Sequence, residues 1–325
     1  MTASLSTVLL TGATGFIGFH VACSLARDTG FQVICIVRKK HNEDRINALK
    51  RIGVLIREGC FFDQSLLEEI FKDFHVQYVV HLAAVRGAGA GKEEEYRRIN
   101  EVGTEVLLQQ SVKAGVQRFL YCSSVGVFGT VPSLIPAGIE TALKGDNLYH
   151  QSKIRAEDMV KKFSSKGIDI CIVRPTITYG SGDNGFPATL IRLVQKKRFL
   201  LCSRDVKIHL LDVTYLSELI RCLLKKERLK SSIYIAADGA PVSLKDLVNI
   251  IHRNKHGKDY PSYLSMPGIL FDCAVSIFKM LKFEKWLVRI LLISRSWYYD
   301  TSIVRDECIE LIPPDTKKKF LAKNM

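Results

Sequence analysis

Three glycines near the start of the chain constrain its fold more than any other feature. Gly12, Gly15 and Gly18 follow an apolar run at residues 7–11 and open a segment with helical periodicity. In such a strand–turn–helix unit, the first glycines permit a tight turn close to a pyrophosphate, and the third lets helix and strand pack closely. The spacing therefore predicts a βαβ unit that binds a dinucleotide. A glycine-rich turn without a ligand is the alternative, and the following strand and helix disfavour it.

The end of the second predicted strand bears on which dinucleotide is bound. NAD-binding units usually present Asp or Glu there to the ribose 2′-hydroxyl. This chain has Arg38 and Lys39 instead, and both could neutralise a 2′-phosphate. The pattern favours NADP over NAD, although a strand-end arginine can also be simply solvated.

Strand-length apolar runs alternate with helical segments along the first half of the chain. The predicted strands span residues 7–11, 32–37, 54–57, 78–82, 118–122 and 169–173, and the predicted helices span 16–27, 43–52, 65–74, 94–114 and 149–165. Residues 65–68 also fit a helix capping box. This alternation predicts an α/β fold with a Rossmann-type, doubly wound parallel sheet.

The pattern loosens beyond Pro175, and a length of 325 residues suggests about two domains. Residues 1–180 are predicted to form the NAD(P)-binding Rossmann domain. We expect 205–240 to return to it, because residues 232–236 have the character of another strand of the main sheet. Residues 181–325 would mainly form a smaller, discontinuous C-terminal lobe that binds substrate.

Composition excludes several function classes. The 47 Lys and Arg exceed the 33 Asp and Glu, which gives a formal net charge of +14. The basic runs lack interleaved aromatics or a nucleic-acid motif, so we expect small-molecule rather than nucleic-acid partners. The apolar stretch at 266–281 contains Asp272 and Lys279 and is shorter than the roughly 20 residues that a bilayer span needs. The sequence thus predicts no transmembrane segment and leaves peripheral membrane contact open.

The nine cysteines are scattered, and no two lie closer than Cys23 and Cys35. Without a CxxC pair, the sequence predicts no metal site and no redox dithiol. No secretory leader is evident at the N-terminus, so a cytoplasmic location with reduced cysteines is expected.

Two short motifs carry candidate chemistry. Tyr149 and Lys153 are four residues apart, on one face of a predicted helix. A tyrosine has an unperturbed pKa of about 10, and a neighbouring ammonium favours the phenolate. Ser123 and Ser124 follow the fifth strand, at the sheet edge where open α/β folds bind ligands. His81, His150 and His209 show no catalytic-triad or metal spacing and are interpreted as packing or surface residues.

Together these motifs resemble the extended short-chain dehydrogenase/reductase family, also described as the NAD-dependent epimerase/dehydratase family. The resemblance includes residues 81–84 (HLAA), 123–129 (SSVGVFG) and 174–180 (RPTITYG). It implies that Ser124 polarises the reacting oxygen and that Tyr149 is the general acid/base. Lys153 would lower the pKa of the tyrosine and hold the nicotinamide ribose.

The resemblance and the glycine motif together give a set of cofactor contacts. Asp63 is expected at the adenine, and Asn100 occupies the place of a structural asparagine near the active site. The full predicted set is Gly12, Thr14, Gly15, Phe16, Ile17, Gly18, Arg38, Lys39, Asp63, Leu82, Ala83, Ala84, Asn100, Lys153 and Pro175. The helices at 94–114 and 149–165 resemble those that form a homodimer interface in relatives, although their apolar faces could equally belong to the core.

The residues after Ser124 narrow the reaction. Dehydratases and decarboxylases of this family carry carboxylates there, whereas this chain has Val125 and Gly126. We therefore expect hydride transfer at a secondary alcohol or ketone carbon, as an oxidoreductase or an epimerase. The presence of Ser124, Tyr149 and Lys153 disfavours a non-catalytic scaffold that only binds the cofactor.

The substrate class is left with two candidates. A nucleotide sugar is the first, although Ile177 replaces the asparagine that nucleotide-sugar enzymes commonly carry near that place. The second is a hydrophobic substrate, as in hydroxysteroid- or flavonol-type enzymes, because residues 269–281 and 286–293 could roof an apolar site. An ordinary amphipathic helix pair that closes the small lobe is the alternative for that segment.

Overall fold

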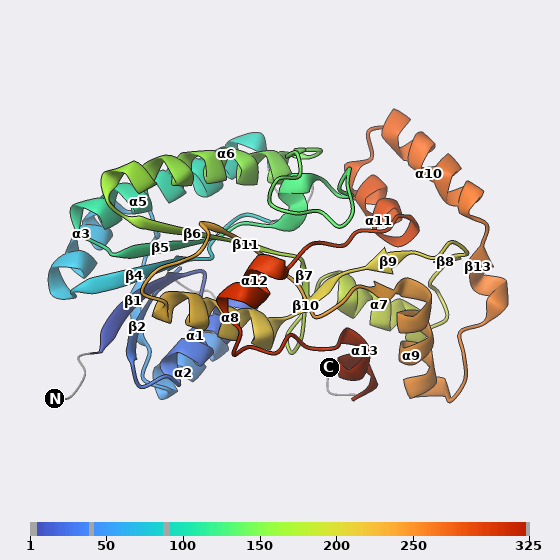
Figure 1. The fold of residues 1–325 in the computed structure, drawn as a ribbon, viewed down its shortest axis with the longest axis horizontal. Helices are drawn as coiled ribbons and strands as arrows, with labels where there is room; N and C mark the ends of the chain where they lie inside the picture. Colours follow the sequence, from blue (N-terminus) through green and yellow to red (C-terminus); the bar gives the residue numbers. More distant parts are fainter. Residues whose placement is uncertain (1–4, 39–41, 87–91, 323–325) are drawn as a thin grey trace.

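The computed structural model describes residues 5–38, 42–86 and 92–322. Its centre is a seven-stranded sheet with the order β11-β6-β5-β4-β1-β2-β3, in which every neighbouring pair is parallel (Figure 1). The strands are β1 (Ser6–Thr11), β2 (Phe31–Val37), β3 (Leu55–Glu58), β4 (Val76–His81), β5 (Arg118–Cys122), β6 (Asp169–Pro175) and β11 (Ile233–Ala236). The predicted Rossmann-type fold is confirmed.

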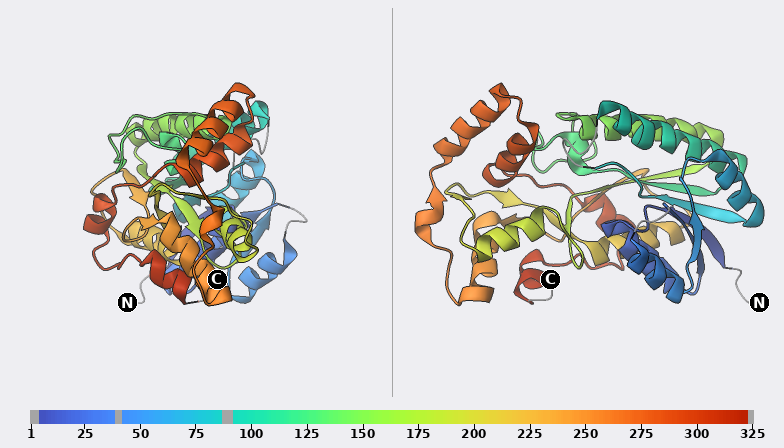
Figure 2. Two further views of the ribbon diagram at one scale, coloured as in Figure 1. Left: turned by 90° about the vertical axis from the view of Figure 1, so that its right-hand side faces the viewer. Right: turned by 180° about the vertical axis from the view of Figure 1, so that it is seen from behind.

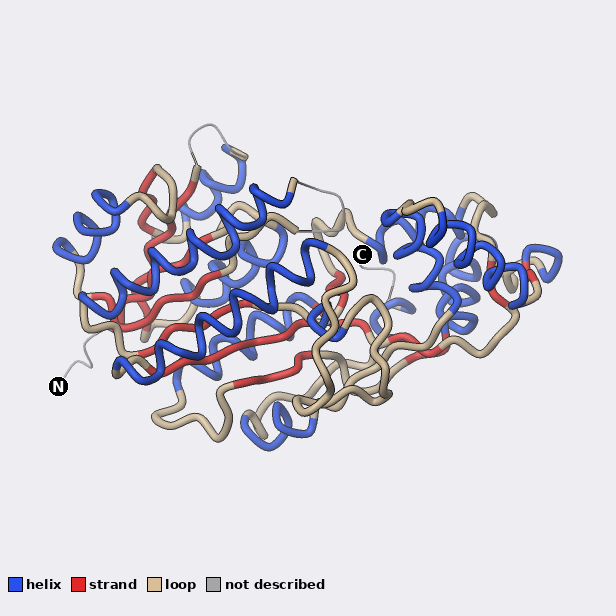
Figure 3. The backbone as a smooth tube through the Cα atoms, turned by 90° about the horizontal axis from the view of Figure 1, so that it is seen from above, coloured by secondary structure: helices blue, strands red, loops and turns tan. Residues whose placement is uncertain are grey.

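Helices cover both faces of this sheet, as Figure 1 and the view from above in Figure 3 show. On one face lie α1 (Phe16–Ala26), α2 (Glu43–Arg51) and α8 (Val213–Lys225), and on the other lie α3 (Gln64–Asp73), α5 (Gly103–Lys113) and α6 (Leu148–Lys162). Successive strand side chains point to opposite faces, so Val8 and Leu10 join one core cluster and Leu9 joins the other. Both faces of the central strands are therefore apolar, as a doubly covered sheet requires.

The strand order reverses between β1 and β4, because the chain builds β2 and β3 to one side and β5 and β6 to the other. Open α/β sheets bind ligands outside the carboxyl ends of their strands at this reversal. The topology thus places a ligand site at the ends of β1 and β4.

Most residues beyond β6 form a second group of elements at one end of the sheet (Figure 2). Three small strand pairs lie there: β7 (Ile177–Tyr179) with β10 (Leu210–Asp212), β9 (Lys207–Ile208) with β12 (Val242–Ser243), and β8 (Leu201–Cys202) with β13 (Ser265–Met266). The helices are α7 (Phe186–Gln195), α9 (Leu244–His256), α10 (Gly268–Met280), α11 (Glu284–Ser294) and α13 (Thr316–Leu321). They enclose a separate core cluster that contains Phe199, Leu247 and Trp297. The remaining helix, α12 (Ser302–Glu307), packs against β11, and its Val304 belongs to the core of the main sheet.

The strand expected at 232–236 is β11, and it pairs with β6 at the edge of the main sheet. The division of the chain into a cofactor domain and a substrate lobe stays a prediction.

Two predicted helices differ from the sequence-based expectation, one in its start and the other in its continuity. The capping box at 65–68 is wrong, because α3 begins at Gln64 and Asp63 is its N-cap, accepting hydrogen bonds from the Ser65 and Leu66 N–H groups. Asp63 directly precedes α3, whereas Ser65 lies inside the helix. The Asp63 carboxylate also interacts favourably with the positive end of the helix dipole. The long helix expected at 94–114 is divided into α4 (Glu93–Tyr96), a π-helical turn (Arg97–Val102) and α5.

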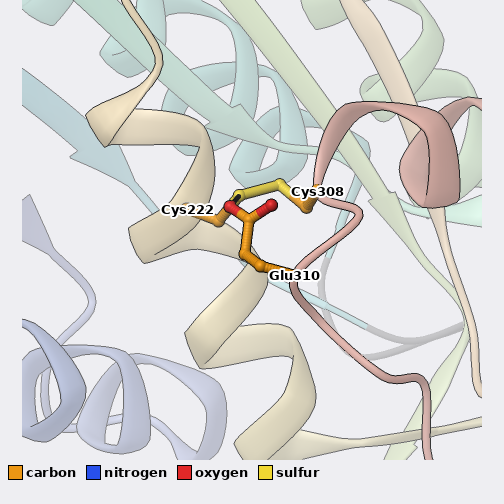
Figure 4. A group of neighbouring side chains, drawn as sticks. All are labelled: Cys222, Cys308 and Glu310. Atoms are coloured by element: carbon orange, nitrogen blue, oxygen red, sulfur yellow. Dashed lines mark hydrogen bonds between the residues drawn. A yellow bond between two sulfur atoms is a disulfide. The ribbon is translucent and has the colours of Figure 1, made fainter.

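The expectation of nine reduced cysteines is wrong for one pair. A disulfide joins Cys222 on α8 to Cys308 after α12, and Glu310 lies beside it (Figure 4). The two cysteines are 86 residues apart, so no local spacing motif indicated their proximity. The other seven cysteines are unpaired. Within the described ranges, no helix has the length and apolar character needed to cross a bilayer.

Candidate functional site

A cavity of about 500 Å³ lies at the carboxyl ends of β1, β2 and β4, where the strand order reverses. Small-molecule pockets are typically about 300–1,000 Å³. The predicted cofactor residues that line it are Gly12, Thr14, Gly15, Phe16, Ile17, Gly18, Arg38, Leu82, Ala83 and Ala84. The structure therefore gathers the glycine loop, the end of β2 and the HLAA segment around one space.

The glycine loop needs its glycines for steric reasons. Gly12 has a φ of +79°, and a Cβ there would lie 2.8 Å from the Ala83 nitrogen. A Cβ on Gly18 would lie 2.1 Å from the Gly12 carbonyl oxygen. These close approaches hold the start of α1 against the loop, as a pyrophosphate-binding turn requires.

The N-terminus of α1 fits an anionic group. Gly15 is the N-cap, so no side chain caps the helix, and no acidic residue stands in its first turn. The first N–H groups of a helix have no partner within the helix and carry partial positive charge. These features fit the pyrophosphate of a dinucleotide.

The outer edge of the pocket is cationic. Arg38 follows β2, is exposed and lines the pocket, as do Arg86 and Arg98. Arg45 reaches across from α2 and donates from Nη1 to the Thr14 carbonyl, 2.9 Å away. Lys39 lies outside the described residues.

Two other predicted cofactor residues, Asp63 and Pro175, have contacts elsewhere in the structure. Phe61 and Phe62 line the pocket, whereas Asp63 caps α3, so its adenine contact stays a prediction. Pro175 ends β6 and pairs with Ala236 of β11.

Asn100 occupies the π-helical turn and is 1% exposed. Its Nδ2 donates to the Val85 carbonyl at 2.9 Å and to Ser152 Oγ at 3.0 Å, while its Oδ1 accepts from the Val85 N–H at 2.8 Å. Because Val85 lines the pocket and Ser152 is on α6, Asn100 ties the wall of the pocket to the helix that carries Tyr149.

The structure brings Ser124 and Tyr149 into contact. Ser124 lies two residues beyond the end of β5, and its Oγ accepts a hydrogen bond from the Gly126 N–H at 3.0 Å. Tyr149 is in the first turn of α6, whose N-cap Asn147 accepts from the His150 N–H at 3.0 Å. The Tyr149 and Ser124 side chains lie beside each other. Burial raises the pKa of Tyr149 to about 12, although the neighbouring Ser124 side chain opposes the shift.

Lys153 lies one turn further along α6 and is 3% exposed. Its Nζ donates to the Cys122 carbonyl at 2.8 Å and to the Tyr121 hydroxyl at 3.2 Å. Burial lowers the pKa of Lys153 to about 8, against the opposing influence of Cys122 and Glu157. The expected lowering of the pKa of Tyr149 by Lys153 is not found, because the ammonium is directed at Tyr121 and Cys122 instead.

An ion pair between His150 and Asp146, which lies beside the candidate catalytic residues, was not predicted from the sequence. His150 Nδ1 lies 2.5 Å from Asp146 Oδ1. A Cβ added to Gly126 would lie 2.4 Å from the His150 ring and 3.2 Å from Ser124 Oγ, so the ring packs directly over this glycine. The available signal was the four-residue spacing of Asp146, just before the N-cap of α6, and His150 in its first turn.

Comparison with known proteins identifies the family. The profile described as "NAD dependent epimerase/dehydratase family" matches residues 8–254. The chain belongs to this family. The resemblance stated from the sequence is thereby confirmed, and the protein is an NAD(P)-dependent enzyme of the epimerase and oxidoreductase type.

Individual relatives differ in what they act on. A UDP-glucose 4-epimerase of Vibrio cholerae is 31% identical over 249 residues, which cover 74% of this chain and 73% of that enzyme. A 4-hydroxy-2-methyl-3-oxo-4-farnesyl-3,4-dihydroquinoline-1-oxide ketoreductase of Stigmatella aurantiaca is 26% identical over 246 residues, covering 74% and 71%. Bordetella bronchiseptica WbmG, solved with NAD and UDP, superposes with a TM-score of 0.76 over 98% of this chain and 92% of its own, at 20% identity. The superposition with WbmG shows that the two proteins share a fold.

Proposed function

We propose that the protein moves a hydride to or from a secondary alcohol or ketone carbon of a nucleotide sugar, with Ser124, Tyr149 and Lys153 as the catalytic residues. The observation that carries this proposal is the placement of the Tyr149 and Ser124 side chains beside each other, just beyond the end of β5. A bound nicotinamide supplies the hydride acceptor or donor. The hydroxyl groups of Ser124 and Tyr149 would supply the hydrogen bond and the proton transfer that hydride chemistry requires at the substrate oxygen.

Each side chain has a separate task at that oxygen. Ser124 Oγ accepts from the Gly126 N–H, which holds the side chain in place, and its own hydroxyl group would donate to the substrate oxygen. Tyr149 gives a proton to that oxygen on reduction and takes it back on oxidation. Lys153 places a buried ammonium beside Tyr121 and Cys122, where it would hold the nicotinamide ribose. Val125 and Gly126 offer no carboxylate, so elimination chemistry lacks its acid and base.

The identity and coverage of the Vibrio cholerae epimerase support a nucleotide sugar as the substrate. A hydrophobic alcohol or ketone is the second candidate, and two observations favour it. The Stigmatella aurantiaca relative is a ketoreductase, and Ile177 in β7 gives a half-buried apolar side chain where nucleotide-sugar enzymes commonly carry an asparagine.

We propose a preference for NADP(H), supported by Arg38 at the end of β2. Its guanidinium is exposed at the rim of the pocket, where it can pair with a 2′-phosphate.

We also propose a homodimer through α5 and α6. These two helices pack side by side on the outer face of the sheet, and Val102 beside them is 45% exposed. Sedimentation of the purified chain tests this proposal. A dimer is expected, and a monomer at working concentration would show that the apolar faces of these helices serve the core alone. A cytoplasmic location likewise stays a prediction.

The experiment for the function combines cofactor titration with two substrate panels. NADPH and NADH binding is followed by fluorescence, and UDP-hexoses and hydrophobic ketones are then added separately. Conversion of a UDP-hexose without net change of cofactor would support the nucleotide-sugar epimerase. Net NADPH oxidation with a ketone would favour the second candidate. Turnover that persists in Tyr149→Phe would contradict the catalytic assignment.

A further inference from the structure

The α10–α11 hairpin leaves an apolar surface uncovered at the outer end of the molecule. Figures 1 and 2 show α10 at the periphery, with α11 between it and the rest of the C-terminal elements. Seven large apolar side chains of this hairpin are 48–75% exposed. We call them the hairpin face: Ile269, Leu270, Ile277, Met280, Leu281, Phe283 and Trp286.

The outward side of α10 is itself apolar, which is unusual for a helix at a protein surface. Ile269, Cys273, Ile277 and Met280 recur at spacings of four, four and three residues, so they share one side of the helix, and all four are exposed. Phe271 is buried on the opposite side. An amphipathic surface helix normally has polar residues on the side away from the core. Exposed apolar patches of this kind mark interaction sites.

Aromatic rings gather where the two helices meet. The Phe278 ring stacks with Trp286 at 6.2 Å between centroids and contacts Phe283 at 6.4 Å. The Arg289 guanidinium lies over the Trp286 ring, 5.1 Å from its centroid. The end of the hairpin where α10 and α11 meet therefore presents aromatic rings, with the Arg289 guanidinium packed on one of them.

Positive charge surrounds this apolar end of the hairpin. Lys279, Lys282 and Lys285 are exposed, and none of the three forms an ion pair within the part of the chain that the structure describes. Asp272 is already paired with Arg204 and Arg295, and the other acidic residue between residues 268 and 294 is Glu284. The hairpin thus combines an apolar surface with a cationic rim.

We propose that the hairpin face docks the protein onto the surface of an anionic lipid bilayer. Trp and Phe side chains favour the membrane interface, and lysines are attracted to anionic headgroups. A helix with one apolar side can lie in the plane of the interface. Such contact agrees with the net charge of +14 and requires no membrane-spanning helix.

A second copy of the chain fits this surface less well. A two-fold contact between identical faces would bring each cluster of Lys279, Lys282 and Lys285 towards its own symmetry mate. Like charges held close together oppose association, whereas phosphate-bearing lipids attract them.

Vesicle flotation with the full chain tests the proposal. We expect binding to phosphatidylcholine vesicles that contain about one third phosphatidylglycerol to be at least about tenfold tighter than binding to phosphatidylcholine alone, because each lysine gains from the anionic surface. Raising the salt concentration should weaken binding to the anionic vesicles. Equal affinity for the two vesicle types would contradict the proposal.

The apolar contribution is tested with a pair of matched variants. Phe283→Ser/Trp286→Ser should lower affinity for anionic vesicles at least about tenfold, because two large side chains lose their place in the interface. The control Ile309→Ser/Ile312→Ser removes apolar side chains that are 77% and 89% exposed but lie outside the hairpin, and it should change little.

The charge contribution has its own pair of triple variants. Lys279→Gln/Lys282→Gln/Lys285→Gln should lose at least about tenfold in affinity and most of the salt dependence. The control variant replaces three exposed lysines on α2, α3 and α5 with glutamine, and it should bind like the wild type; these are Lys50, Lys72 and Lys113.

Three results would overturn the proposal. They are a lack of binding to anionic vesicles, equal losses in the hairpin and control variants, and a soluble dimer that the Phe283/Trp286 variant dissociates without any vesicle binding. The last would show that a second copy covers this face. Because flotation requires no turnover, failure here is separate from failure of the proposed catalytic function.

Discussion

The buried ion pair between Glu157 and Arg174 permits a quantitative prediction. Glu157 is on α6 one turn beyond Lys153, and Arg174 is on β6. Their side chains are 0% and 1% exposed, and Arg174 donates from Nε and Nη2 to the two carboxylate oxygens at 2.9 and 2.6 Å. Removing one partner of such a pair leaves an uncompensated buried charge. We therefore expect Glu157→Gln to lower the free energy of unfolding by about 3–5 kcal/mol.

Urea unfolding followed by circular dichroism measures this loss. The matched control is Glu101→Gln, which removes the carboxylate that Arg155 contacts in a more exposed pair, and it should cost under about 1 kcal/mol. The double variant Glu157→Gln/Arg174→Met removes both charges and should recover part of the loss. A loss for Glu157→Gln no larger than that of the control would refute the reasoning.

The same substitution has a second consequence, at Lys153. The charge of Glu157 raises the pKa of Lys153 and so partly offsets the effect of burial. Without it, the ammonium should lose its proton at a lower pH. The pH dependence of cofactor binding should shift in the acid direction in Glu157→Gln, and a purely structural role for Glu157 would leave the profile where it is.

Four shorter predictions concern the cofactor and the reaction. Tyr149→Phe should lower kcat by about 10²–10⁴-fold while the cofactor Kd stays nearly unchanged; loss of cofactor binding would mean that the tyrosine is structural. Arg38→Asp should shift the ratio of NADPH to NADH affinity at least about tenfold towards NADH, and an unchanged ratio would exclude the 2′-phosphate contact. Gly18→Ala should weaken binding of both cofactors at least about tenfold, because its Cβ would lie 2.1 Å from a carbonyl oxygen. Cofactor affinity of the free enzyme should fall as the pH rises through about 8, where Lys153 loses its charge; a flat titration would contradict the lowered pKa.

Sequence periodicity was sufficient to predict the parallel sheet. Strands buried on both faces are continuously apolar, and the helices between them repeat apolar residues every three to four positions. The glycine loop was also predictable, since all of its interactions fall within a short segment. Ser124 and Tyr149 are separated by a long loop, so their proximity was inferred from the family resemblance alone. The structure brings them together because β5 ends and α6 begins at the same edge of the sheet.

Features that depend on distant segments could not be predicted. The Cys222–Cys308 disulfide requires α8 and the end of α12 to meet, and neither cysteine has a local motif. Nothing in the sequence distinguishes Arg174 and Glu157 from exposed charged residues, because their burial and pairing depend on the tertiary fold. The outward apolar side of α10 was equally hidden, because periodicity identifies an apolar face without showing whether anything covers it.

The central claim is that Tyr149 and Ser124 serve a hydride transfer at a sugar or ketone carbon. The most direct measurement is the near-ultraviolet absorbance of the reduced nicotinamide when enzyme loaded with oxidised cofactor is mixed rapidly with UDP-hexoses or hydrophobic secondary alcohols. We predict that reduced cofactor forms with one substrate class in the wild type, transiently for an epimerase, and that Tyr149→Phe abolishes this signal. Signals of equal rate in both proteins, or substrate conversion without any reduced cofactor, would contradict the account.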